Sequence, residues 1–217
     1  MKKTKLAIFA SGSGSNAMNL IQYFKSHSTI EVELILSNNK NAPIIAKAEA
    51  ENVKTFCLTN AEVSDGTILN EFCQKNNIDW IILAGYLRLI PADFITHFEN
   101  KIINLHPSLL PKYGGKGMFG SHVHEAVIAN KETNTGISIH YVNHDFDKGA
   151  IIAQFHCAVD ANDTVNNVAA KIHQLETEAD VLTRDIFSEL NKTFITPLDR
   201  EDMQRIASKI DDVIDFM

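Results

Sequence analysis

Strand-like apolar runs alternate with helix-like segments along most of this chain of 217 residues. The clearest run, DWIILAG at residues 79–85, is almost continuously apolar, as expected of a strand that is covered on both faces. Strands that alternate with helices favour right-handed crossovers and a mostly parallel sheet with helices on both faces. The alternation therefore predicts an α/β fold built on a Rossmann-like, mostly parallel twisted sheet.

The same alternation gives the expected order of the elements. Strands are expected at residues 5–10, 32–37, 54–58, 79–85, 101–105, 136–142 and 151–159. Helices are expected at residues 15–25, 43–52, 65–76, 91–98, 122–130 and 164–190. We expect one domain over residues 1–190, with a C-terminal tail or helix at 191–217 that packs on the same domain.

Composition limits the partners of the chain. The formal net charge is −7, and no basic stripe is present that would displace counterions from a nucleic acid. The longest apolar run has the length of a strand, so we expect no membrane span. The three cysteines are widely separated and form no C-x-x-C pair, which is typical of a reducing compartment. We therefore expect a cytoplasmic protein without nucleic-acid or membrane partners, either a monomer or a homodimer.

The loop SGSGSN at residues 11–16 directly follows an apolar run that ends at Ala10. A strand that enters a helix through such a loop is typical of an anion site at the helix N-terminus. The loop also fits the dinucleotide pattern G-x-G-x-x-G/A, but the second strand ends in SNN, without the acid that would hold a ribose hydroxyl. We therefore favour a monophosphate over NAD. The alternative is a tight turn in which Ser15 or Asn16 caps the helix.

The central stretch INLHPSLLPKYGG, residues 103–115, carries the strongest chemical pattern. Asn104 and His106 are two residues apart at the end of an expected strand, so their side chains point to one face. A carboxamide beside an imidazole suits acyl transfer, which needs a donor for a developing oxyanion and a group that exchanges a proton. The alternative is structural, with Asn104 ending the strand and His106 packing in the loop.

A carboxylate that orients the imidazole would favour the catalytic alternative. Asp145 and Asp147 lie in the expected loop between the last two strands, at the rim of the sheet. An aspartate beside His106 would favour the imidazolium and raise its pKa. Either acid could instead belong to a turn around Gly149.

These motifs together resemble a known family. NLHPSLLP at residues 104–111, followed by Asp147-x-Gly149, is similar to the signature of the 10-formyltetrahydrofolate-dependent formyltransferases. SGSGSN at 11–16 and AGYLRLIP at 84–91 extend the resemblance, which covers about residues 5–190 in matching order. It implies the formyltransferase fold and formyl transfer from 10-formyltetrahydrofolate, as co-substrate, to the amine of glycinamide ribonucleotide in purine biosynthesis.

The resemblance also implies roles for individual residues. Asn104, His106 and Asp147 would form the catalytic trio, and Asp145 would belong to the loop. The ribotide phosphate would bind at Gly14, Ser15 and Asn16. The folate would lie along Leu87, Arg88, Leu89, Ile90, Asn104, Val142 and Asp147.

Glu176 interrupts the apolar stripe of the long helix expected at residues 164–190. A carboxylate on an apolar face should be paired or functional, because burying it alone is costly. The alternative is an edge position from which the side chain reaches water. The family resemblance places a glutamate here against the glycinamide, so Glu176 joins the expected substrate site.

Two segments depart from the common family pattern. The stretch at residues 114–125 is longer and richer in glycine than usual, which suits a loop that closes over substrate. The stretch at residues 62–72 has no arginine, although many relatives supply one towards the folate. Nine histidines raise the possibility of zinc, but the spacing of His122, His124, His140 and His144 fits no known zinc pattern. We expect no metal.

Relatives with the same trio also formylate methionyl-tRNA or hydrolyse 10-formyltetrahydrofolate. The tRNA enzymes would carry a C-terminal RNA-binding domain, for which the segment after Leu190 is too short. The hydrolases would carry a regulatory domain before the first strand. In this chain the first strand is expected to begin by residue 5. Hydrolysis of 10-formyltetrahydrofolate remains the alternative activity. A non-catalytic nucleotide-binding module would explain the loop at 11–16 but not the trio.

Overall fold

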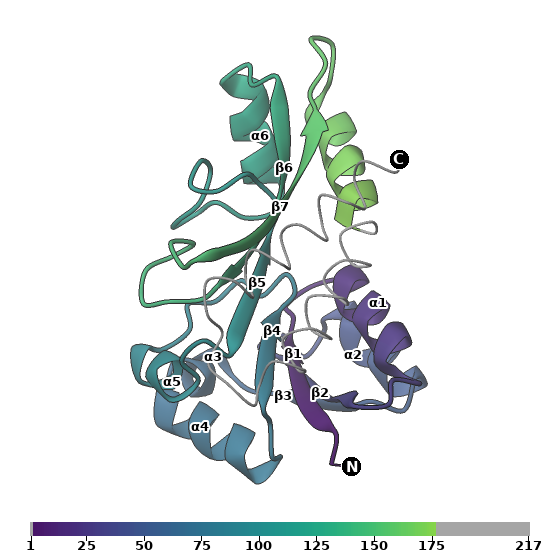
Figure 1. Cartoon of the computed structure of the whole chain (residues 1–217), viewed down its shortest axis with the longest axis vertical. Coiled ribbons are helices and arrows are strands. Elements are labelled where there is room, and N and C mark those ends of the chain that lie inside the picture. The colour runs from purple at the N-terminus through teal and green to yellow at the C-terminus, as the bar shows by residue number, and fades with distance from the viewer. Residues whose placement is uncertain (1, 177–217) are drawn as a thin grey trace.

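Seven strands form one sheet in the order β3-β2-β1-β4-β5-β6-β7 in the computed structural model, which describes residues 2–176 (Figure 1). The strands are β1 Thr4–Phe9, β2 Ile30–Ser37, β3 Lys54–Cys57, β4 Trp80–Leu83, β5 Ile102–His106, β6 Asn134–Tyr141 and β7 Ile151–Ala158. The helices are α1 Ser15–Phe24, α2 Pro43–Ala50, α3 Asn60–Val63, α4 Gly66–Lys75, α5 Ala92–His97 and α6 Ser121–Ala129.

The first five strands are parallel, whereas β6 and β7 each run antiparallel to the preceding strand. This confirms the predicted α/β fold with a mostly parallel sheet, and all seven predicted strands are present. The sequence patterns did not predict α3. Its first turn is stabilised by a capping box, in which the side chains of Thr59 and Glu62 each accept a backbone N–H of the other residue.

The sheet separates two apolar cores, because successive residues of a strand point to opposite faces. In β1, Leu6 and Ile8 join a core that contains the buried faces of α1 and α2. Ala7 and Phe9 join the other core, which contains the buried faces of α4 and α5. Helices on both faces therefore hold the central strands, as Figure 1 shows.

A further helix starts after β7 and is described as far as residue 176. At its start Thr164 and Asn167 form reciprocal bonds between side chain and backbone, and Val168 and Ile172 are buried in the α1 core. The expected boundary at 190 and the expected tail at 191–217 lie outside the described residues. Within residues 2–176, no helix combines the length and apolar character needed to cross a membrane.

The strand order reverses at one point, between β1 and β4. The chain proceeds outward from β1 through β2 to β3, and then returns to β4 on the other side of β1. The segments that follow β1 and β4 therefore leave on opposite faces of the sheet, which is where ligands bind in folds of this type.

Gly14 shapes the loop after β1 and also allows α2 to approach it. Its φ is 69°, in the left-handed region, and a Cβ placed there would lie 2.5 Å from side-chain carbons of Ile44 in α2. Any other residue here would have a strained backbone and a steric clash with buried packing.

We predict that Gly14→Ala lowers the free energy of unfolding by about 2–4 kcal/mol, the sum of the left-handed strain and the overpacking. Gly12→Ala is the matched control, because a Cβ at Gly12 would meet no atom within 4 Å. Denaturant unfolding of both variants checks the prediction. Equal stability of the two variants would contradict it.

Candidate active site

A pocket of about 510 Å³ lies beyond the carboxyl ends of β1, β4 and β5. Its walls come from the loop after β1, the segment after β4, the glycine-rich loop before α6 and the loop between β6 and β7. The pocket is lined by every residue that the sequence assigned to catalysis or substrate binding: Gly14, Ser15, Asn16, Leu87, Arg88, Leu89, Ile90, Asn104, His106, Val142, Asp147 and Glu176.

The N-terminus of α1 opens towards this pocket. Gly14 is the residue that precedes the helix, and within the described chain no side chain caps it. The structural alternative, a cap by Ser15 or Asn16, is therefore wrong. The first-turn N–H groups of a helix carry partial positive charge and favour an anion.

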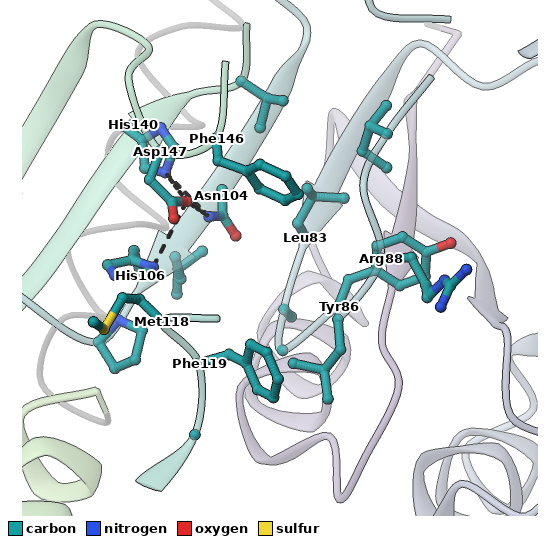
Figure 2. A pocket seen from close by; sticks show the side chains of 18 of the residues that line it. Leu83, Tyr86, Arg88, Asn104, His106, Met118, Phe119, His140, Phe146 and Asp147 are labelled. Carbon is teal, nitrogen blue, oxygen red and sulfur yellow. Dashed lines mark hydrogen bonds and ion pairs between the residues drawn. The ribbon is translucent and has the colours of Figure 1, made fainter. Parts of the chain in front are cut away.

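The segment after β4 gives the pocket an apolar mouth. Leu87 and Leu89 are each 52% exposed. Phe119, from the glycine-rich loop, and Phe146, from the β6–β7 loop, are also exposed. Figure 2 shows the Phe146 ring in the space between Asn104 and Leu83 and the Phe119 ring lower in the view, on the side of Tyr86. The sequence analysis did not identify these two rings, because glycine-rich and turn-rich loops carry no periodicity that shows which way a side chain points.

The side chains of Asn104, His106 and Asp147 meet at one oxygen atom. The two-residue spacing in β5 places Asn104 and His106 side by side, and the β6–β7 loop brings Asp147 across from them (Figure 2). Oδ1 of Asp147 lies 3.3 Å from Nδ2 of Asn104 and 3.7 Å from Nδ1 of His106. Asp147 has a left-handed φ of 52°, which aspartate tolerates better than most residues. The sequence predicted this trio.

His140 is a fourth member of the cluster, for which the sequence analysis had no role. It lies directly opposite Asn104 in the antiparallel pairing of β5 with β6. Its Nδ1 is 2.8 Å from the carbonyl oxygen of Tyr141, so Nδ1 carries the proton. In neutral His140, Nε2 then accepts a hydrogen bond from Nδ2 of Asn104 at 3.0 Å.

This pairing sets the orientation of the Asn104 carboxamide. Its NH₂ group faces two acceptors, Nε2 of His140 and Oδ1 of Asp147, and a flipped amide would direct its oxygen at both. Figure 2 shows the Asn104 oxygen turned away from Asp147. The signal that could have identified His140 is its place opposite Asn104, which requires the strand register.

His106 is buried, and its Nε2 donates to the carbonyl oxygen of Tyr113 at 2.8 Å. Nδ1 is therefore the nitrogen that faces Asp147, and it is left without a proton when the imidazole is neutral. Burial lowers the pKa of His106 more than the nearby Asp147 raises it, so the pKa lies below its ordinary value. The expectation that Asp147 would raise this pKa gave the right sign for the carboxylate but the wrong net result, because desolvation dominates.

Asp147 remains ionised in the same surroundings. Burial acts to raise the pKa of its carboxyl, but the attraction to His140 and His106 when these carry a positive charge, together with the N–H of Gly115, holds the pKa below its ordinary value. The Gly115 N–H donates to Oδ2 at 2.9 Å. The resting site therefore combines a carboxylate with a neutral imidazole.

Glu176, the last described residue, reaches the pocket from the C-terminal helix. Its side chain is 20% exposed, and its Oε2 lies 3.4 Å from Nδ1 of His173 on the same helix. The placement fits the expected substrate contact better than a side chain that reaches into open water.

His122 and His124 lie in the first turn of α6, as the sequence indicated. Over residues 2–176, no group of three or more histidine, cysteine, aspartate or glutamate side chains is arranged to hold a metal ion.

Comparison with known proteins identifies the family. Residues 4–183 match the family model described as formyl transferase. The chain belongs to the formyl transferase family. This confirms the resemblance drawn from the motifs at residues 11–16, 84–91 and 104–111.

Individual relatives of this formyl transferase have names that are more specific than the name of the family. The chloroplastic phosphoribosylglycinamide formyltransferase of Arabidopsis thaliana is 36% identical over 187 residues, which cover 82% of this chain and 64% of that protein. The Bacillus subtilis (strain 168) phosphoribosylglycinamide formyltransferase is 33% identical over 178 residues, which cover 79% and 88%. The crystal structure of glycinamide ribonucleotide transformylase 1 from Geobacillus kaustophilus has a TM-score of 0.73 at 31% identity and covers 81% and 94%.

We predict that stability falls in mild acid because burial lowers the pKa values of His106 and His124. Below about pH 6.5 an unfolded histidine binds a proton that the folded one does not, so the free energy of unfolding decreases as pH falls. His124→Gln removes one of these groups and should make the decrease between pH 7 and pH 5 smaller. Urea unfolding at several pH values measures it, and equal slopes for the two proteins would contradict the prediction.

Proposed function

We propose that this chain transfers the formyl group of 10-formyltetrahydrofolate to the amine of glycinamide ribonucleotide, a step of purine biosynthesis. The observation that carries the proposal is the convergence of Asn104, His106 and Asp147 in a pocket that also contains an uncapped helix N-terminus. The names of the relatives support the same activity.

The pocket offers separate places for the two substrates. The N–H groups at Gly14, Ser15 and Asn16 would bind the ribotide phosphate, because a helix N-terminus favours an anion. Glu176 would contact the glycinamide. The folate would lie along Leu87 to Ile90, Val142 and the catalytic trio, where exposed leucine side chains offer an apolar surface to an aromatic ring system.

The reaction proceeds by addition and elimination at the formyl carbon. The substrate amine forms the new C–N bond, and the carbonyl electrons move to oxygen to give a tetrahedral oxyanion. Collapse of this intermediate breaks the bond to N10 of the folate and re-forms the carbonyl. One proton leaves the amine and one proton arrives at N10, so the reaction needs a group that carries a proton between the two nitrogens.

His106 is suited to carry this proton. Its lowered pKa keeps it neutral at rest, and its Nδ1 lone pair is free of the Tyr113 carbonyl, so it can accept the proton of the attacking amine. Asp147, 3.7 Å away, then stabilises the imidazolium until the proton passes to N10. Water links these atoms wherever the direct distance is too long.

The oxyanion requires donors that are already in place before charge develops. In the resting site Nδ2 of Asn104 and the unprotonated Nδ1 of His106 both face Oδ1 of Asp147, and Nδ1 becomes a second donor when it takes the proton of the attacking amine. We propose that the formyl oxygen approaches these same two donors. The hydrogen bond to His140 holds the Asn104 amide in the orientation that would present its NH₂ group to the formyl oxygen.

The proposal also covers the compartment, the partners and the extent of the formyltransferase unit. All three cysteines are free thiols, which suits a reducing compartment such as the cytoplasm. The proposed partners are the two small-molecule substrates, with the protein acting as a monomer or homodimer. The formyltransferase unit would extend to residue 190. None of the proposed steps uses a metal.

An assay of substrate dependence tests the activity. Purified protein is incubated with 10-formyltetrahydrofolate, and release of tetrahydrofolate is followed with and without glycinamide ribonucleotide. We expect release that requires the ribotide and yields its formylated product. Release at the same rate without the ribotide would instead indicate a hydrolase, and no release in either case would refute the proposal.

A second prediction concerns the proton carrier. Asp147→Asn removes the charge that raises the pKa of His106, so the acidic limb of the kcat/KM profile should move to lower pH while kcat falls about 100-fold or more. Asp145→Asn, in the same loop but exposed, is the matched control and should keep near-normal rates. An Asp147→Asn enzyme with near-normal kcat, folded as judged by its unfolding curve, would remove Asp147 from the mechanism.

A further inference from the structure

Ser11 lies between the end of β1 and the loop that forms the proposed phosphate site. Its backbone N–H donates to the carbonyl oxygen of Gly85 at 3.1 Å. Its hydroxyl accepts the backbone N–H of Leu87 at 3.1 Å and donates to Oδ1 of Asn38 at 2.7 Å. One residue is thus bonded to the ends of β1, β2 and β4.

The segment at residues 85–90 depends strongly on these bonds. It has no regular secondary structure, and across the described chain both of the backbone hydrogen bonds that it makes end on Ser11. Tyr86 and Ile90 anchor the segment in the apolar core, whereas Leu87 between them is half exposed. The Leu87 backbone is therefore held by two restraints, the buried side chain of Tyr86 next to it and the hydrogen bond to the Ser11 hydroxyl.

The hydroxyl is itself held in one orientation. Asn38 accepts its proton, and the Asn38 amide in turn donates to Oδ1 of Asn60 at 3.0 Å in α3. With its proton committed to Asn38, the Ser11 oxygen presents a lone pair to the N–H of Leu87. A hydroxyl without such a partner would rotate and hold the Leu87 backbone less firmly.

We infer that Ser11 is a positioning residue that couples the two substrate sites. It continues directly into the loop that would bind the ribotide phosphate, and it holds the segment along which the formyl folate would lie. Ordering of the phosphate loop by one substrate therefore steadies the surface that receives the other. This inference rests on the proposed function, and it adds a residue that touches neither substrate.

Ser11→Ala tests the inference, with Thr96→Ala as the matched control. Thr96 is an exposed residue whose hydroxyl donates to the carbonyl oxygen of Ala92 within α5, and it belongs neither to the chain of bonds around Ser11 nor to the pocket lining. We expect Ser11→Ala to raise the KM for 10-formyltetrahydrofolate about three- to tenfold, as for one lost hydrogen bond, with kcat within about twofold. Because coupling between two ligands is reciprocal, the KM for the ribotide at saturating formyl folate should rise as well. Thr96→Ala should match the wild type in all three.

Binding separates coupling from a simple loss of affinity. Calorimetry measures the Kd of tetrahydrofolate with and without saturating glycinamide ribonucleotide. The wild type should bind tetrahydrofolate more tightly with the ribotide present, and in Ser11→Ala this ratio should fall towards one. An unchanged folate KM, or an unchanged ratio, would overturn the inference. If the wild type transfers no formyl group, the proposed function fails instead, so the two failures are distinguishable.

Discussion

The candidate site depends on the position of β5 between a parallel neighbour and an antiparallel one. Pairing with β4 makes β5 the last strand of the parallel half of the sheet. Pairing with β6 on its other side places His140 opposite Asn104. The β6–β7 connection then returns Asp147 to the end of the same strand. A shift of one residue in the β5–β6 register would turn the facing side chains to the other side of the sheet and separate the cluster.

Desolvation outweighs charge pairing at His106, whereas the contacts of Asp147 outweigh the desolvation of its carboxylate. Burial makes ionisation costly, and Asp147 stays charged because it has several donors around it, whereas His106 has one carboxylate at 3.7 Å and stays neutral. A neutral imidazole next to a fixed carboxylate can accept a proton and then stabilise the resulting charge. Substrates that exclude further water would strengthen this interaction, because the electrostatic attraction grows as the effective dielectric constant falls.

Both halves of the sheet supply residues that line the pocket. The parallel half supplies the helix N-terminus at Gly14 and the apolar segment at residues 85–90, both at the point where the strand order reverses. The polar cluster lies where the two halves meet, because β5 supplies Asn104 and His106 whereas β6 and the loop that follows it supply His140 and Asp147. Ser11 links the ends of β1, β2 and β4 through its hydroxyl and backbone.

The resemblance to the formyltransferases selected Asp147 over Asp145. The sequence alone determined the class of fold, the order of the strands along the chain and the placement of Asn104 beside His106. These depend on local patterns: apolar runs, the two-residue spacing of Asn104 and His106, and the loop at residues 11–16. The tertiary structure decided the role of His140, the net direction of the pKa shift at His106 and the bonds of Ser11. Each of these depends on neighbours far away in the chain, since cross-strand partners and desolvation exist only once the sheet has formed.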